Sequence, residues 1–325
     1  MTTDAVRISE ELYDIIVSEH TLHSISIIPF LKSSLVLEHG NLAISATIYK
    51  SLSLHTYQEF QTVRKSPESP EKDQLVLKLT NVLVLLNPDD ARFWNHRKRF
   101  LRDQTIITTS VTPSSQQSHQ VVISRELELA RRVLLVKPKC PEAFNHCRWV
   151  LHHQYHKRRC DDISQDVSND VITKETICHQ LDMCSSSASS YKHNYYSWTY
   201  RLWLVTWFPS LVSLDQELSW SRKWIESHVS QYCGINYRFN LVRLSSQGQH
   251  GQVEVTGEIW YNELSWLCEL ILFHPDVQAF WCYLRVLLAY FCSCDISFDD
   301  KNLDNVLKVD NQFSKRFKKL LKCTS

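Results

Sequence analysis

One short motif recurs along this chain and limits what it can fold into. Residues 94–101 read WNHRKRFL, and residues 144–151 read FNHCRWVL. With the spacing relaxed, an aromatic residue followed three or four positions later by Lys or Arg recurs at a long, similar spacing, at Trp94, Phe144, Trp198, Phe239 and Trp281. These five anchors lie 41 to 54 residues apart. A period of this length indicates that the chain repeats one structural unit.

Proline marks the same unit independently. Pro88, Pro138 and Pro275 each precede an anchor by six residues. Ahead of Pro88 and Pro275 the apolar residues recur at spacings of three and four, which places them on one face of a helix. The helix ends there because proline disfavours helical geometry in the residue before it. Asp or Pro in the turn can then begin a second helix, which carries the anchor. Each unit is therefore predicted to be a helix, a short turn and another helix.

The fold class follows from how such units bury their apolar faces. A lone helix pair leaves its stripe in water, whereas stacked pairs cover one another. The chain has only five glycines but ten tryptophans, which disfavours a fold of strands and tight turns. We predict an all-α fold, a right-handed α-α superhelix in which helical hairpins stack into a crescent, as in tetratricopeptide arrays. Each buried anchor should contribute roughly 1.5–3 kcal/mol.

The chain divides into three predicted regions. Residues 1–66 contain helical segments without a motif copy and are expected to form an N-terminal helical cap. Residues 70–292 hold the repeats. Residues 293–325 form a C-terminal helical tail that ends in a basic amphipathic segment.

Composition argues against several classes of protein. A formal net charge of +1 gives no overall attraction to nucleic acid, so none is predicted as a partner. No apolar run is long enough for a transmembrane segment, and the N-terminus lacks the pattern of a signal peptide. The eleven cysteines without framework spacing indicate reduced thiols and a cytoplasmic protein. His152, His156 and Cys160 are spaced by four, but without H-E-x-x-H or a fourth ligand they predict no metal site.

The motif resembles that of a known family. Helix pairs with W-x-H-R-R-type sequences preceded by P-K-N-Y are typical of protein prenyltransferase α subunits. VKPKCPEAFNHCRWVL (136–151) and SYKHNYYSWTYRLWLV (190–205) look like two consecutive repeats of that family, and LNPDDARFWNHRKRFL (86–101) looks like the one before. The resemblance covers roughly residues 75–290. It is greatest to a divergent branch of repeat-containing relatives.

This resemblance implies an enzyme subunit. In the family, a crescent of helix pairs wraps a separate β subunit, which carries zinc, so the α chain itself binds no cofactor. For the branch, the resemblance implies pairing with the β subunit of Rab geranylgeranyltransferase. The reaction implied is transfer of a prenyl group from geranylgeranyl diphosphate to a C-terminal cysteine of an acceptor protein. The chain would be active only together with the β subunit.

The resemblance also assigns a catalytic residue. Lys139 stands five residues before Phe144, where the family has a lysine that reaches the diphosphate. When the carbon–oxygen bond breaks, negative charge grows on the leaving diphosphate, and a positioned ammonium group stabilises the transition state more than the ground state. This chain departs from the family pattern at Cys140 and Pro141, where the family has Asn-Tyr. The contact of that tyrosine is therefore absent.

The next repeat supplies the predicted substrate-binding residues. Asn194 and Tyr195 match the family's Asn-Tyr pair, with Tyr196 beside them, and could hydrogen-bond the substrate or position Lys139. A lysine in a turn is ordinarily a solvated charge, and Asn-Tyr is ordinarily a helix start. A non-catalytic helical-repeat scaffold that binds peptides or proteins is therefore the alternative function. The two differ in whether the chain binds a zinc-containing subunit or binds peptides.

Overall fold

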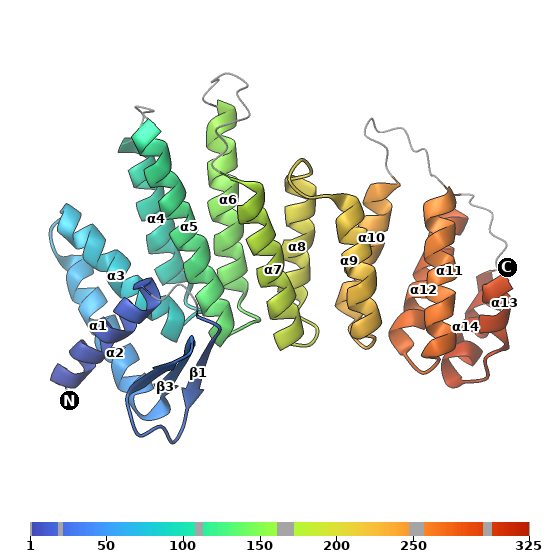
Figure 1. Cartoon of the computed structure of the whole chain (residues 1–325), viewed down its shortest axis with the longest axis horizontal. Coiled ribbons are helices and arrows are strands. Elements are labelled where there is room, and N and C mark those ends of the chain that lie inside the picture. The colour runs from blue at the N-terminus through green and yellow to red at the C-terminus, as the bar shows by residue number, and fades with distance from the viewer. Residues whose placement is uncertain are drawn as a thin grey trace. The chain divides into compact units, whose positions relative to one another are not determined.

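The structure is a computed structural model that describes residues 2–18, 22–107, 113–160, 172–246, 257–294 and 301–324. Within these ranges lie fourteen helices and three short strands (Figure 1). The predicted all-α, helical-repeat class is confirmed. Contacts within the chain define two compact units, residues 1–200 and 201–325, and they do not coincide with the three predicted regions. The division falls inside helix α8 (Tyr195–Trp207).

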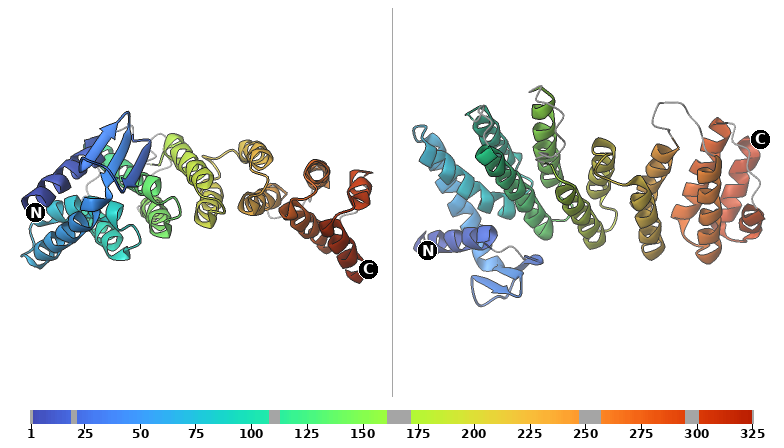
Figure 2. Two further views of the ribbon diagram at one scale, coloured as in Figure 1. Left: turned by 90° about the horizontal axis from the view of Figure 1, so that it is seen from below. Right: turned by 45° about the horizontal axis from the view of Figure 1, so that its top comes forward.

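Unit 1 is a stack of helix pairs. Its helices are α1 (Thr2–Ser18), α2 (Ala46–Lys65), α3 (Pro70–Leu86), α4 (Ala91–Ile107), α5 (Pro113–Val136), α6 (Pro141–Cys160), α7 (Lys174–Ser190) and the start of α8. Helix α3 packs against α4, and α5 packs against α6. The pairs then stack through α3 on α5, α4 on α6 and α5 on α7 (Figure 2). The repeated hairpin predicted from the proline and anchor pattern is thus present.

Local chemistry explains where several helices begin. Helices α3, α5 and α6 all start at a proline, whose fixed φ suits the first helical turn and whose missing N–H is not needed there. Ser69 caps α3, since its hydroxyl oxygen accepts a hydrogen bond from the Lys72 backbone N–H at 3.2 Å. Thr173 caps α7 in the same way, through the Thr176 N–H at 3.2 Å. Such caps satisfy N–H groups that have no partner inside the helix.

Residues 24–45 correct the expectation of a purely helical N-terminal cap. They form strands β1 (Ser24–Ile28), β2 (Leu35–Glu38) and β3 (Asn41–Ser45), in the order β1-β3-β2. Strand β3 pairs in parallel with β1 and antiparallel with β2. His39 and Gly40 both have positive φ, 48° and 76°, as a two-residue hairpin turn requires. The sheet buries the side chains of Ile25, Leu42 and Ile44 and contacts α2 and α5.

Unit 2 contains the end of α8 and a second stack. Its helices are α9 (Leu214–Ser227), α10 (Tyr232–Ser245), α11 (Gly257–Phe273), α12 (Gln278–Ser293), α13 (Lys301–Lys308) and α14 (Gln312–Thr324). Helix α9 packs against α10 and α11 against α12, while α13 and α14 lie on α11 and α12. The predicted C-terminal tail is therefore a further helix pair. The basic amphipathic segment predicted from the sequence is α14.

Candidate functional site

The residues predicted to act in catalysis lie at the turns that join the two helices of a pair. Lys139 lies in the turn between α5 and α6, and its side chain is half-buried. Its Nζ atom lies 5.0 Å from the ring centroid of Tyr191, which belongs to the corresponding turn between α7 and α8. Within the described residues Lys139 forms no ion pair with a carboxylate. Its positive charge is therefore stabilised by a cation–π contact with the Tyr191 ring and is not neutralised by a carboxylate of the described residues.

Tyr195 and Tyr196 begin helix α8 beside this turn. Their side chains are 60% and 36% exposed, and their rings meet edge to face with centroids 5.8 Å apart. Together with Tyr191, which is also exposed, they give the turn an aromatic surface. The sequence did not single out Tyr191, although the family-like segment that begins at residue 190 contains it.

Asn194 has a different position from the one expected of a substrate-binding residue. It is fully buried. Its Nδ2 donates to the carbonyl oxygens of Pro138 at 2.6 Å and Ser187 at 3.1 Å. Its Oδ1 accepts the backbone N–H of Ser197 at 3.3 Å. The amide thus caps α8 and ties its turn to the preceding turn, which leaves it no exposed group for a substrate.

The same contact between turns recurs in unit 2. Asn311 donates from Nδ2 to the carbonyl oxygen of Pro275 at 2.6 Å and accepts the N–H of Ser314 on Oδ1 at 2.8 Å. In unit 1, the thiol of Cys140 faces the carbonyl oxygen of Pro88 at 3.5 Å. Each proline of the sequence pattern therefore presents its carbonyl oxygen to the turn of the next helix pair. We call this series of contacts the turn ladder.

The anchor residues lie behind these turns. The indole Nε1 of Trp94 donates to the carbonyl oxygen of Pro88 at 2.9 Å, and that of Trp281 donates to Pro275 at 2.8 Å. Both contacts span the six residues of the sequence pattern. Four predicted anchors are buried, with exposures of 1–5%: Trp94, Phe144, Trp198 and Trp281.

The structure corrects the prediction of Phe239 as the fifth anchor. The guanidinium groups of Arg97 and Arg238 each donate to a carbonyl oxygen 20 residues earlier and to a hydroxyl 17 residues earlier. Since Trp94 lies three residues before Arg97, the matching anchor is the buried Ile235. Phe239 lies a turn further along α10, half-buried, against aromatic rings of α11 and α12. An arginine four residues after it produced the false match.

Buried polar networks accompany the anchors and were missed by the sequence analysis. The residue two positions after an anchor reaches a polar side chain 20 residues earlier in four pairs, His146–Glu126, Tyr200–Gln180, Tyr237–Glu217 and Tyr283–Glu263. The three glutamates also bind buried arginines, in the pairs Arg97–Glu126, Arg201–Glu217 and Arg238–Glu263. The constant separation of 20 residues was the signal that could have revealed them.

These networks hold fixed protonation states. Burial alone raises the pKa of Glu126, but the Arg97 charge and the His146 hydrogen bond outweigh it and hold that pKa at about 2. Burial lowers the pKa of His146, so its ring is neutral and donates from Nε2 to Glu126 at 2.9 Å. Burial raises the pKa of Tyr283, which keeps its hydroxyl a donor. Their burial and mutual pairing make these groups structural.

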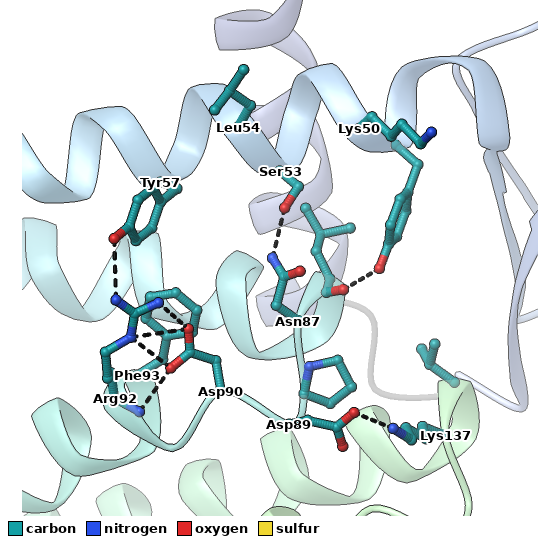
Figure 3. A pocket seen from close by; sticks show the side chains of 14 residues that line it. Lys50, Ser53, Leu54, Tyr57, Asn87, Asp89, Asp90, Arg92, Phe93 and Lys137 are labelled. Atoms are coloured by element: carbon teal, nitrogen blue, oxygen red, sulfur yellow. Dashed lines mark hydrogen bonds and ion pairs between the residues drawn. The ribbon is translucent and has the colours of Figure 1, made fainter.

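A pocket of about 920 Å³ opens at the α3–α4 turn of unit 1. Helix α2 forms one wall and the end of α5 another (Figure 3). Arg92 binds Asp90 through Nε and Nη2 at 2.6–3.1 Å and donates from Nη1 to the Tyr57 hydroxyl at 3.2 Å. Lys137 pairs with Asp89 across the opening, and this hydrogen bond raises the pKa of Lys137.

One group of side chains nearby could be compared with a metal site. Asp89, Cys140 and Glu142 bring ligand atoms within 4.8 Å of one another. Burial raises the pKa of the Cys140 thiol to about 12, so it stays protonated, and Asp89 already binds Lys137. This chemistry fits a turn contact better than a metal ligand. Of the histidine and cysteine trio noted in the sequence, the side chains of His156 and Cys160 lie outside the described residues.

None of the helices in the described ranges has the length and apolar character that crossing a membrane requires.

Comparison with known proteins agrees with the fold and the turns. Residues 123–154 match the protein prenyltransferase alpha subunit repeat. The chain is 24% identical over 288 residues to protein prenyltransferase alpha subunit repeat-containing protein 1 of Danio rerio, an alignment that covers 78% of this chain and 63% of the relative. The human protein of that name is 28% identical over 224 residues, covering 66% and 52%.

A more distant relative is an enzyme subunit by name. Geranylgeranyl transferase type-2 subunit alpha of Mus musculus is 24% identical over 261 residues, covering 77% of this chain and 41% of the relative. The chain thus spans about half to two thirds of the length of the relatives of the repeat-containing branch. Its fold and turns define a helical-repeat protein made of paired α-helices. More narrowly, residues 123–154 carry a protein prenyltransferase alpha subunit repeat, and the chain is similar to proteins named for that repeat.

Proposed function

We propose that this chain is the α-type subunit of a heterodimeric protein prenyltransferase. The partner would be a zinc-bearing β subunit of the kind found in Rab geranylgeranyltransferase, and the two would act together in the cytoplasm. The family match and the name of the mouse relative support this assignment. The observation that carries it is the ammonium group of Lys139, which lies in a turn beside Tyr191 and has no carboxylate partner among the described residues.

The reaction we propose is geranylgeranyl transfer to a C-terminal cysteine of an acceptor protein. The thiolate sulfur attacks the first carbon of the prenyl chain, a carbon–sulfur bond forms, and the carbon–oxygen bond to diphosphate breaks. The diphosphate leaves with the bonding electron pair. Lys139 would stabilise that charge, because an ammonium group without a carboxylate partner keeps its full attraction for an anion. Zinc in the β subunit would make the thiolate.

Tyr195 and Tyr196 would contribute to the substrate site through their exposed hydroxyl groups. Asn194 would act indirectly, because its amide holds the α7–α8 turn against Pro138, the residue before Lys139. We therefore assign Asn194 a positioning role, in which it fixes the distance between the Lys139 turn and the Tyr191 turn.

The test is to co-express the chain with the β subunit of Rab geranylgeranyltransferase and to assay the purified complex. Labelled geranylgeranyl and farnesyl diphosphates would serve as donors, with cytosolic protein as the source of acceptor. Lys139→Ala should leave assembly intact and lower turnover by at least about tenfold. Lys223→Ala is the control, because Lys223 is an exposed lysine that lies in α9 and not in these turns.

Two outcomes would oppose the proposal in different ways. An active complex in which Lys139→Ala turns over at the normal rate would remove Lys139 from the mechanism. A chain that forms no complex with the β subunit and remains a stable monomer that binds peptides would instead be the non-catalytic scaffold.

A further inference from the structure

The pocket at the α3–α4 turn has walls that are already held in place. Arg92 is fixed between Asp90 and the Tyr57 hydroxyl. Asn87 donates from Nδ2 to the Ser53 hydroxyl at 2.6 Å, which joins the turn to α2 (Figure 3). A site whose polar groups are fixed before binding loses less conformational freedom when a ligand arrives. The pocket is thus organised as a binding site and is more than a gap between helices.

The charges around the pocket narrow the class of ligand. Asp90 is neutralised by Arg92, and Asp89 by Lys137. Lys50 is exposed and forms no ion pair within the described part of the chain, so it is the one lining cation left uncompensated. A ligand with several phosphates would bring more negative charge than the single unpaired ammonium group of Lys50 can balance. A ligand with a single carboxylate would find one free ammonium group.

The apolar part of the pocket adds a second requirement. Leu54 lines the pocket and is 57% exposed, and Pro88 and Val136 are further apolar residues of the lining. It lies four residues after Lys50 on α2, so the two side chains emerge from the same helix face about 5–6 Å apart. That separation corresponds to roughly two residues of an extended polypeptide. An apolar side chain and a carboxylate two residues apart lie on the same side of an extended chain and would reach both.

Hydrogen-bonding groups on the wall favour a polypeptide backbone. Asn87 uses its Nδ2 on Ser53, and among the described residues nothing donates to its Oδ1, which is left to accept a peptide N–H. The Lys137 ammonium group can donate to a peptide carbonyl while it stays near Asp89. A site that offers both acceptors and donors suits a chain whose backbone alternates N–H and C=O groups.

We propose that this pocket binds an extended segment of a partner polypeptide in which an Asp or Glu stands two residues from a large apolar residue. The carboxylate binds Lys50 and the apolar side chain packs on Leu54. This site does not require prenyl transfer. The bound segment could belong to an acceptor protein of the enzyme or to a binding partner of a scaffold. If the pocket binds no such peptide, the proposed role of Lys139 is unaffected.

The experiment uses the full chain and a displayed library of random ten-residue peptides. Selected sequences are expected to carry Asp or Glu within two positions of Leu, Ile, Met or Phe. A fluorescein-labelled consensus peptide should then lose at least about tenfold in affinity on Lys50→Glu, because attraction becomes repulsion. Selection against the Lys50→Glu chain should instead enrich Lys or Arg. Leu54→Asp should weaken the original peptide as well.

Lys65→Glu is the matched control, since Lys65 is exposed on the same helix and does not line the pocket. It changes the net charge equally and should leave affinity unchanged. Lys50 and Leu54 are both exposed, so the variants should keep the thermal unfolding midpoint of the parent chain. The proposal is overturned if no peptide is enriched, or if enriched peptides bind the Lys50→Glu chain equally. Binding of a labelled single-stranded RNA that is lost in Lys50→Glu would overturn it too.

Discussion

The buried network of α4, α5 and α6 in unit 1 and that of α10, α11 and α12 in unit 2 share two members and differ in the third. In unit 1, Arg97 and His146 hold Glu126, at 2.5 Å and 2.9 Å. In unit 2, an arginine and a tyrosine hold Glu263, both at 2.7 Å (Arg238 and Tyr283). The carboxylate and the guanidinium group are kept, whereas the third donor changes. Both networks therefore pair a buried glutamate with a buried arginine and complete the set with a neutral donor, a histidine in one and a tyrosine in the other.

The shared pair connects three helices in each unit. The guanidinium group of Arg97 reaches a carbonyl oxygen of α3 and a glutamate of α5. That of Arg238 reaches a carbonyl oxygen of α9 and a glutamate of α11. An arginine supplies five N–H donors in a fixed plane, so one side chain can join both neighbours. The predictions below test whether the two networks are equivalent, and how far the third member matters.

Removal of the carboxylate should have the largest effect. Glu126→Gln and Glu263→Gln should each lower the free energy of unfolding by about 3–5 kcal/mol, because each leaves a buried guanidinium group without its counter-charge. Urea unfolding followed by tryptophan fluorescence measures the loss. Hydrogen exchange of peptides from α5 and α11 shows which unit opens.

Glu11→Gln is the control, because Glu11 pairs with Arg7 at 4.0 Å on an exposed surface, where ion pairs contribute little. Equal losses in the two units would support equivalence. A loss confined to one unit would show that the network of the other unit is not needed for stability. Losses no larger than that of the control would show that neither network is needed.

Removal of one contact of the turn ladder should lower the free energy of unfolding less than removal of a buried carboxylate. Asn194→Ala and Asn311→Ala should each lower the free energy of unfolding by about 2 kcal/mol, since each removes a helix cap and one N–H donor to a turn carbonyl. Differential scanning calorimetry of the single variants measures this. Asn194→Asp keeps the capping oxygen but loses the N–H donor, so it should lie between the parent and the Ala variant. If Asn194→Asp matches Ala, the cap contributes nothing.

The sequence was most informative about contacts that stay within a few residues. Trp94 and Pro88 are six residues apart and meet in the structure, so their periodicity revealed the hairpin. Asn194 and Pro138 also meet, but 56 residues apart, and residue type alone did not distinguish a cap from a substrate contact. The sheet of residues 24–45 was missed because two five-residue strands and one of four residues give too few alternations to be detected.

The third member of the network is a histidine in unit 1 (His146) and a tyrosine in unit 2 (Tyr283). This difference should make the network of unit 1, and not that of unit 2, sensitive to pH near neutrality. Burial lowers the pKa of His146 in the folded chain, so the unfolded chain takes up this proton first as the pH falls below about 6.5. Unit 1 should lose stability on acidification from pH 7 to pH 5.5, by no more than about 1.4 kcal/mol per pH unit for one proton. The loss stops once the pH is below the folded pKa.

Exchanging the histidine and the tyrosine between the two networks should move the pH sensitivity of stability from unit 1 to unit 2. His146→Tyr should reduce the slope between pH 7 and pH 5.5 and leave the share of His96, whose pKa is also lowered by burial, and Tyr283→His should create a slope in unit 2. Urea midpoints at several pH values, with hydrogen exchange in α6 and α12, provide the measurement. A His146→Tyr chain that keeps the parent's slope would assign the sensitivity to another group.

The smallest expected effect is a gain. Cys140 occupies the ladder position that Asn194 and Asn311 occupy elsewhere, but it offers Pro88 only a weak thiol donor at 3.5 Å. Cys140→Asn should raise the free energy of unfolding by about 1 kcal/mol, because an amide gives that carbonyl an N–H donor and offers its own oxygen as a helix cap. Cys140→Ser, which is no larger than cysteine, separates hydrogen bonding from volume. If Ser stabilises and Asn destabilises, the buried site is too small for an amide, and the first turn uses cysteine for its size. If both destabilise, the contact with Pro88 is apolar in character, and the turn ladder begins only with Asn194.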